Sequence, residues 1–197
     1  MNLSEKIKSM ILSGIVEEQH RKIGVEIESF YYEKGDLSRL ALENKNKYSA
    51  IDLLSDINKI AQANHKLIER KICKDNKEDI VLILKDWTNN KDIDVIITTG
   101  GTGLTGRDIT PEAIEEIADK KIPGFGEVFR TISLKTVGTS SIQSRACAVL
   151  SNGKYIFALP GSSGGVTDAW DGILKHQLDI NHKPCNFVEL FPRLKEK

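Results

Sequence analysis

Apolar residues recur with two different periods along residues 49–197, and the change from one period to the other predicts helices and strands in turn. Helical spacing covers residues 53–61 and the stretch after Asp75, and the strand-like run at 67–72 and the apolar run at 95–98 predict strands. The predicted inner face of the helix after Asp75 consists of Ile80, Val81, Leu84 and Trp87. Helices that alternate with apolar strands favour a parallel sheet covered on both faces, with ligands at the carboxyl ends of its strands.

The second half of the chain adds an antiparallel pair to this pattern. Runs at 145–150 and 155–159 flank Asn152-Gly153, which is the strongest short signal for a hairpin. A glycine-rich loop at 160–165 then precedes a helix with the apolar face Ala169, Trp170, Ile173 and Leu174. The predicted fold is therefore a three-layer, doubly wound α/β domain, with a mostly parallel sheet, one antiparallel hairpin pair and helices on both faces.

We expect one such domain over residues 37–197, preceded by an extension at 1–36. The spacing of apolar residues from Leu3 to Gln19 predicts an amphipathic helix, and Gly24 to Tyr32 suits a short strand or an extended arm. The apolar run of the helix is far below the roughly 20 residues that a membrane span needs, and it lacks the cleavage site of a signal peptide.

A glycine-rich stretch follows the run at 95–98 directly, namely Thr99-Gly100-Gly101-Thr102-Gly103. A buried strand that ends in glycines presents backbone amides to which an anion can come close, and proteins hold phosphate in this way. Thr110 is expected to cap a further helix, with Pro111 in its first position. The alternative is a tight turn between a strand and a helix that binds no ligand.

Two carboxylates stand near the expected carboxyl ends of the strands. Asp108 lies in the glycine loop itself, and a carboxylate among anion-binding amides predicts a cation, of which magnesium is the usual one. Asp75 forms a D-x-x-E pattern with Glu78, so its simplest role is to cap the helix that follows. Because both loops fall at the same edge of the predicted sheet, they are expected to form one site.

Composition and charge narrow the class of protein. The 28 basic and 28 acidic residues balance, so neither nucleic acid nor a membrane surface is expected as a partner, because both favour a basic excess. Cys73, Cys147 and Cys185 lie in or beside apolar runs without metal-ligand spacing, and buried thiols are expected. These features agree with a cytoplasmic enzyme.

Several blocks of sequence, in order, resemble the MoaB/MogA family of molybdenum cofactor biosynthesis. They are Thr98 to Gly103, Arg107 to Ala113, Pro123 to Glu127, Gly138 to Ser140, Ser144 to Ala146 and Leu159 to Ser162. The resemblance implies an enzyme that activates molybdopterin with ATP, assisted by Mg²⁺, and forms adenylylated molybdopterin and pyrophosphate. It also implies a homotrimer or homohexamer, and the aromatic tail at 184–192 would suit a subunit contact.

The resemblance also implies roles for individual residues. Asp75 and Asp108 match the functional aspartates of the family and are expected to position the metal or the phosphates of the nucleotide. The family's phosphate cradle corresponds to Thr99, Gly100, Gly101, Thr102 and Gly103. Its pterin-site loop corresponds to Ser144 and Arg145, and Pro160, Gly161 and Ser162 would form a wall for the pterin or the nucleotide.

The chain departs from the family pattern near its start. Residues 39–44 stand where the family has its first strand, and Lys47-Tyr48-Ser49-Ala50 stands where an Asp-x-Ser-Gly segment is expected. Lysine in place of the acid changes the local charge by about two units. Two alternatives therefore remain beside the adenylyltransferase: a protein that binds molybdopterin or its precursor without catalysis, and a structural or nucleotide-binding subunit of a cofactor-assembly complex.

Overall fold

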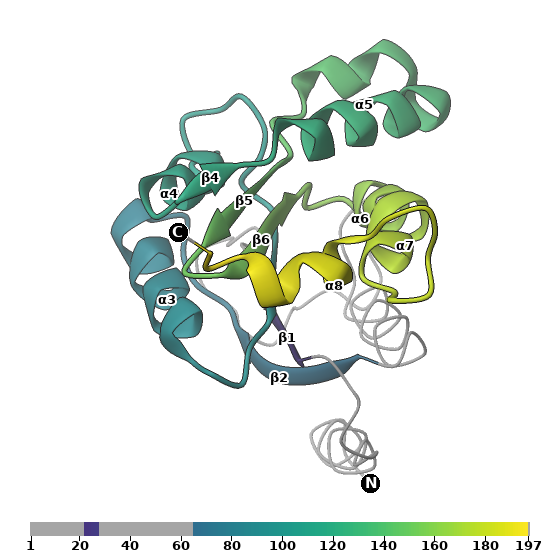
Figure 1. Cartoon of the computed structure of the whole chain (residues 1–197). Coiled ribbons are helices and arrows are strands. Elements are labelled where there is room, and N and C mark those ends of the chain that lie inside the picture. The colour runs from purple at the N-terminus through teal and green to yellow at the C-terminus, as the bar shows by residue number, and fades with distance from the viewer. Residues whose placement is uncertain (1–21, 28–64, 197) are drawn as a thin grey trace, which may run out of the picture.

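A computed structural model describes residues 22–27 and 65–196 of the chain, and these residues form a six-stranded sheet in the order β2-β1-β3-β6-β5-β4 (Figure 1). The strands are β1 (Lys22–Ile27), β2 (Lys66–Lys71), β3 (Val95–Thr99), β4 (Lys120–Lys121), β5 (Cys147–Ser151) and β6 (Lys154–Leu159). The first, second, third and sixth strands run parallel, and β5 is antiparallel to both of its neighbours. The predicted mixed, mostly parallel sheet is confirmed, and the short edge strand β4 adds a second antiparallel pair.

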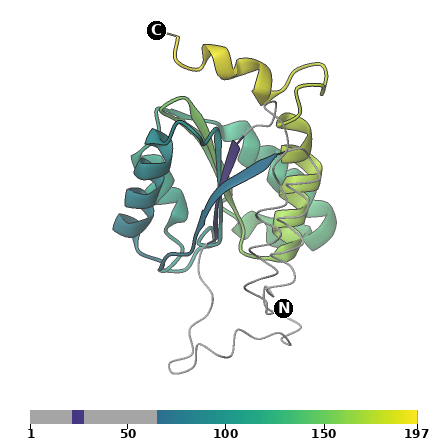
Figure 2. The ribbon, with the colours of Figure 1, turned by 90° about the horizontal axis from the view of Figure 1, so that it is seen from below.

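Helical segments cover both faces of the sheet (Figure 2). They are α3 (Lys77–Asn89), α4 (Thr110–Glu116), α5 (Pro123–Val137), η1 (Gly138–Gln143), α6 (Ser163–Ala169), η2 (Trp170–Leu174), α7 (Lys175–Gln177), α8 (Phe187–Leu190) and η3 (Phe191–Arg193). Helices α3 and α4 pack on one face, and α5 with α6 and η2 pack on the other. The predicted three-layer arrangement is confirmed.

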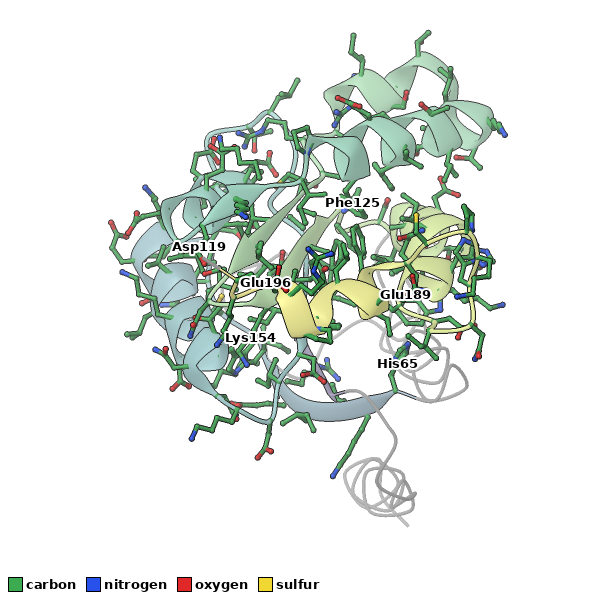
Figure 3. All side chains as sticks on the ribbon, viewed as in Figure 1. His65, Asp119, Phe125, Lys154, Glu189 and Glu196 are labelled. Atoms are coloured by element: carbon green, nitrogen blue, oxygen red, sulfur yellow. The ribbon has the colours of Figure 1, made fainter. Side chains whose placement is uncertain are left out.

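The two layers of core side chains follow the alternation along the central strands. Ile96 and Ile156 face α3 and α4, whereas Ile97 and Phe157 face the opposite layer with Phe125 of α5, whose ring centroid lies 5.1 Å from that of Phe157 (Figure 3). Strands β3 and β6 are buried along their whole length, as expected for parallel strands covered on both sides. None of the helices formed by residues 65–196 is long and apolar enough to cross a membrane.

The predicted hairpin joins β5 to β6. Asn152 and Gly153 both have positive φ, at 48° and 72°, as a tight two-residue turn requires. Lys154, the first residue of β6, is buried and donates hydrogen bonds through Nζ to the carbonyls of Asn90 and Ile93, just after α3 (Figure 3). The hairpin is thereby fastened to the segment that leads into β3.

Strand β1 comes from the segment that was expected to be an extension. Lys22–Ile27 lies between β2 and β3 and pairs in parallel with both, which agrees with the strand alternative for the region around Gly24. The helices expected at 3–19 and 53–61, and the strand and altered motif at 39–50, lie outside the described residues.

Both expected helix caps were placed one residue away from the observed positions. Asn76, not Asp75, is the N-cap of α3, because its backbone is extended and its side chain accepts a hydrogen bond from the Asp79 amide at 3.0 Å. Thr110 is already the first residue of α4, after the N-cap Ile109, and its amide donates to the carbonyl of Gly101 at 3.1 Å.

The aromatic residues of the C-terminal tail pack against the chain itself and are half-buried, and the expected subunit contact stays a prediction. The rings of Phe187 and Phe191 lie 4.7 and 5.1 Å from that of Tyr155, measured between centroids. The hydroxyl of Tyr155 also donates to the carbonyl of Phe187 at 3.1 Å. The expectation of three buried thiols is wrong for Cys185, which is exposed in the loop before α8, whereas Cys73 and Cys147 are half-buried.

Gly126 allows α5 to approach the backbone just before β5, and its replacement tests this packing. A Cβ atom at Gly126 would lie 2.6 Å from the carbonyl oxygen of Ala146, whereas one at Gly124 would meet nothing within 4 Å. We predict that Gly126→Ala lowers the free energy of unfolding by about 1–3 kcal/mol, measured by denaturant titration. Gly124→Ala, the matched control, should be neutral or stabilising by up to about 1 kcal/mol. Equal stabilities of the two variants would contradict this account.

Candidate phosphate-binding site at the carboxyl edge of the sheet

The parallel strands bring the loops of interest to one edge of the sheet. Because β2, β3 and β6 point in the same direction, the segments that follow them leave the sheet on the same side. These segments contain Asp75, the glycine loop at 100–109 and the second loop at 160–162. The C-terminal tail, which packs on Tyr155 at the start of β6, lies at the opposite end of that strand.

The two glycine-rich loops contact each other, although about 60 residues separate them in the chain. The amide of Gly100 donates to the carbonyl of Leu159 at 3.0 Å, and the hydroxyl of Thr99 donates to the carbonyl of Pro160 at 3.2 Å. A Cβ atom at Gly161 would lie 3.2 Å from the Cα of Gly100, so the backbones meet with little space between them. The second loop ends at Ser162, whose side chain caps α6 by accepting from the Gly165 amide at 3.2 Å.

The structure reduces the number of backbone amides in the predicted phosphate cradle that could bind an anion. Gly100 and Gly101 have φ of 105° and 63°, a conformation that favours glycine. The amide of Gly100 is already bonded to Leu159, and the carboxylate of Asp108 lies directly beside Gly103, where its Oδ2 would be 2.8 Å from an added Cβ atom. Within the described part of the chain, no backbone carbonyl accepts from the amides of Gly101 or Thr102. These two amides are therefore the strongest candidates for an anion.

Asp108 folds back onto its own loop. One oxygen of its carboxylate, Oδ2, accepts hydrogen bonds from the amide and the hydroxyl of Thr105, at 2.8 and 2.6 Å. Partial burial acts to raise the pKa of Asp108, but the hydrogen bonds from Thr105 and Gly103 and the positive charge of Arg145 together lower it below its usual value. The ionised carboxylate thus stabilises the loop that contains it.

Arg145 reaches the same loop from the segment before β5. Its Nε donates to the carbonyl of Gly103 at 2.7 Å, its Nη2 donates to the carbonyl of Asp108, and its Nη1 pairs with the carboxylate of Glu112 on α4. Its own amide donates to the carbonyl of Thr102 at 2.8 Å. The hydrogen bond from Arg145 is the main cause that holds the pKa of Glu112 below its usual range.

Ser144 lies in the turn that carries Arg145, and its hydroxyl bonds within that turn. Its hydroxyl accepts from the amide of Ala146 at 3.3 Å. Arg130 of α5 donates through Nη1 toward the carbonyls of Ser144 and Ala146, at 3.3 and 3.4 Å. The turn is thus anchored to α5 on one side and, through Arg145, to the glycine loop on the other.

Asp75 shares the edge of the sheet with these loops. It is half-buried on the loop after β2, and β1 lies between β2 and β3, so the two strands are about 10 Å apart. Over residues 65–196, no cluster of three or more His, Cys, Asp or Glu side chains could hold a metal ion. The structure therefore joins Asp108, Arg145 and the glycine loops in one hydrogen-bonded network, and the role of Asp75 beside them stays a prediction.

Three residues of the network were missed by sequence reasoning. The spacing of Thr105 and Asp108 is typical of a loop closed by a side-chain hydrogen bond, and this signal was available. Glu112 and Arg130 gave no local signal, because each acts on a segment at least 14 residues away.

Comparisons with known proteins agree with the fold and the loops. A family model described as "Probable molybdopterin binding domain" matches residues 37–180. Molybdenum cofactor biosynthesis protein B of Escherichia coli strain K12 is 42% identical over 135 residues, which are 68% of this chain and 78% of that protein.

Solved structures show the same similarity. A crystal structure of molybdenum cofactor biosynthesis protein B has a TM-score of 0.70 at 30% identity, covering 91% of this chain and 98% of that one. The tungsten cofactor synthesizing protein MoaB from Pyrococcus furiosus has a TM-score of 0.62 at 30% identity, covering 81% and 94% of the two chains.

The doubly wound sheet with paired glycine loops is an α/β domain of the class that the matching family model describes as a probable molybdopterin binding domain. Within this class, the chain belongs to the MoaB/MogA family. These relatives support a role in molybdenum cofactor biosynthesis.

Removal of the Thr105 hydroxyl tests the electrostatics of the loop. We predict that Thr105→Val raises the pKa of Asp108 toward its usual value, because a hydrogen bond to the charged form is lost. An NMR titration of the Asp108 carboxyl carbon measures the change. Thr131→Val is the control, since its hydroxyl bonds only to the Glu127 carbonyl among the residues that the structure describes. An unchanged Asp108 titration in Thr105→Val would contradict the assignment.

Proposed function

We propose that the chain adenylylates molybdopterin with ATP, assisted by Mg²⁺, and releases pyrophosphate. Membership of the MoaB/MogA family and the names of the relatives support the place of this reaction in molybdenum cofactor biosynthesis. The observation that carries the proposal is the contact between the loops of Gly100 and Gly161 at the carboxyl edge of the sheet.

The contact between the loops suits a reaction between two phosphate groups. In the proposed step, a terminal phosphate oxygen of molybdopterin attacks the α-phosphorus of ATP. A new P–O bond forms there, and the bond to the β-phosphate breaks, so that pyrophosphate leaves with the electron pair. The demands of such a transfer on a protein are the positioning of two anions and the stabilisation of their charge.

In this proposal the backbone holds the substrates. The amides of Gly101 and Thr102 bind phosphate, the segment Pro160 to Ser162 forms a wall of the site, and the turn at Ser144 and Arg145 borders the pterin. The hydroxyl of Thr99 joins the two loops by its hydrogen bond to Pro160. The close approach of Gly161 to Gly100 keeps both loops within reach of one substrate.

The residues at this edge fit a magnesium ion. Mg²⁺ binds oxygen ligands, commonly one or two carboxylates together with water and substrate phosphates, so a cluster of three protein ligands is not required. Asp108 is the first candidate ligand because its carboxylate is ionised and held in the loop, and Asp75 is the second. When bound, the ion would offset the negative charge of the phosphates.

One observation favours a second candidate, a protein that binds molybdopterin without transferring a nucleotide. The Asp108 carboxylate already accepts hydrogen bonds from Thr105 and Gly103, and these bonds compete with a metal for its oxygens. The two functions differ in the turnover of ATP but share the same binding edge.

The proposal includes a homotrimer or homohexamer in the cytoplasm. Beside the half-buried aromatic tail, a second candidate for a subunit contact is the apolar surface of α5 and η1. This surface exposes Val128, Leu134, Val137 and Ile142. Apolar residues that gather on one exposed face commonly mark a protein interface.

Pyrophosphate release from ATP tests the reaction. We predict release only when molybdopterin and magnesium are both present, and its loss in Asp108→Ala, because that carboxylate is the first candidate metal ligand. Asp86→Ala is the matched control, since Asp86 is an exposed carboxylate on α3 that pairs with Lys71, and it should keep wild-type turnover. Retained turnover in Asp108→Ala would contradict the role of Asp108, and molybdopterin binding by the wild type without any release would favour the second candidate.

A further inference from the structure

We propose that Arg145 and Glu112 are positioning residues, which hold the glycine loop in its binding conformation, and that Arg145 is not itself a ligand of molybdopterin. The inference rests on the proposed function for what the loop binds. Its structural part, the holding of the loop, stands on the hydrogen bonds of the chain alone.

The structure bonds three of the five N–H groups of the Arg145 guanidinium to the protein. Each of its three nitrogens donates to a protein oxygen: the carbonyl of Gly103, the carbonyl of Asp108 and the carboxylate of Glu112. One N–H on each Nη has no protein partner among the described residues, so what weakens Arg145 as a ligand for a phosphate is the balance of its charge. Since Glu112 also neutralises the charge of Arg145, the pair offers little net attraction to an anion.

The acceptors of Arg145 lie at the two ends of one loop segment. Gly103 and Asp108 begin and end it, and a single guanidinium holds both of their carbonyls. Within the segment, Asp108 accepts from Thr105, and the amide of Asp108 donates back to the carbonyl of Thr105 at 3.0 Å. Arg145 therefore closes the loop from outside, while Asp108 and Thr105 close it from within.

The backbone of Arg145 also fixes the peptide group that directly follows the candidate phosphate-binding amides of Gly101 and Thr102. The backbone amide of Arg145 donates to the carbonyl of Thr102, which orients the peptide group between Thr102 and Gly103. Arginine suits this task because its planar group presents several donors in fixed directions, whereas lysine offers a single point of charge. Glu112 holds the guanidinium from the first turn of α4.

Amide hydrogen exchange in the ligand-free protein tests the holding role directly. We expect the amides of Gly103 and Thr105 to exchange at least about tenfold faster in Arg145→Lys and in Glu112→Gln, because hydrogen bonds to charged groups are lost. Amides of β3 and β6 should keep wild-type rates, which separates a local effect from general destabilisation. The control is Arg193→Lys, which alters the exposed ion pair between Arg193, the last residue of η3, and Glu196. It should change the exchange rates neither of the loop amides nor of the strand amides.

The direction in which Glu112→Gln changes the affinity for molybdopterin shows whether Arg145 positions the loop or contacts the ligand. If Arg145 positions the loop, loss of the Glu112 charge loosens the loop and weakens binding. If Arg145 contacts the phosphate, the same change frees a cation for the ligand and strengthens binding. We expect affinity to fall at least about threefold by titration calorimetry, and unchanged or increased affinity would overturn the proposal.

Amide exchange and the binding titration together distinguish failure of the positioning role from failure of the proposed function. Unchanged exchange at Gly103 and Thr105 in both variants would overturn the holding role whatever the wild type binds. If the wild-type protein does not bind molybdopterin, the proposed function fails, and the exchange rates still decide whether Arg145 and Glu112 hold the loop. If one variant does not fold, the other carries the exchange test.

Discussion

The parallel pairing of β3 with β6 is the constraint on which the rest of the structure depends. Val95 pairs with Tyr155 and Thr99 with Leu159, so both strands reach the edge of the sheet at the same level. Two loops that are distant in sequence therefore leave the sheet together, and the bond from Gly100 to Leu159 extends the ladder into them. The hairpin turn that returns β5 into β6, fastened through Lys154, sets this register from the opposite end.

At the carboxyl edge, charged side chains support the loop while its backbone is left to bind a ligand. Asp108 and Arg145 form hydrogen bonds with groups of the loop, and Glu112 balances the charge of the arginine. A rigid loop keeps its amides in place before the ligand arrives, which lowers the entropic cost of binding. Arg130 of α5 holds the turn before Arg145 by a hydrogen bond to the carbonyl of Ser144.

The sequence predicted those parts of the fold that depend on local pattern. The strand-like runs located β2, β3 and β6, and Asn152-Gly153 located the hairpin, because turn chemistry and burial act over a few neighbouring residues. Long-range contacts were not predictable in this way. The inclusion of β1 in the sheet and the covering of Phe187 by Tyr155 depend on residues far apart in the chain. For the candidate site, the glycine loops and Asp108 could be identified from sequence, whereas the engagement of Arg145 by Glu112 could not.

Mapping of bound molybdopterin by NMR tests the central claim, that the ligand binds where the two glycine loops meet. With isotopically labelled protein, the account predicts that the largest amide shifts on titration with molybdopterin fall at Gly101, Thr102, Gly161 and Ser162. The hairpin at Asn152 and Gly153, at the far end of β6, should show none. Largest shifts at the hairpin, or on α3 away from the carboxyl edge, would contradict the account.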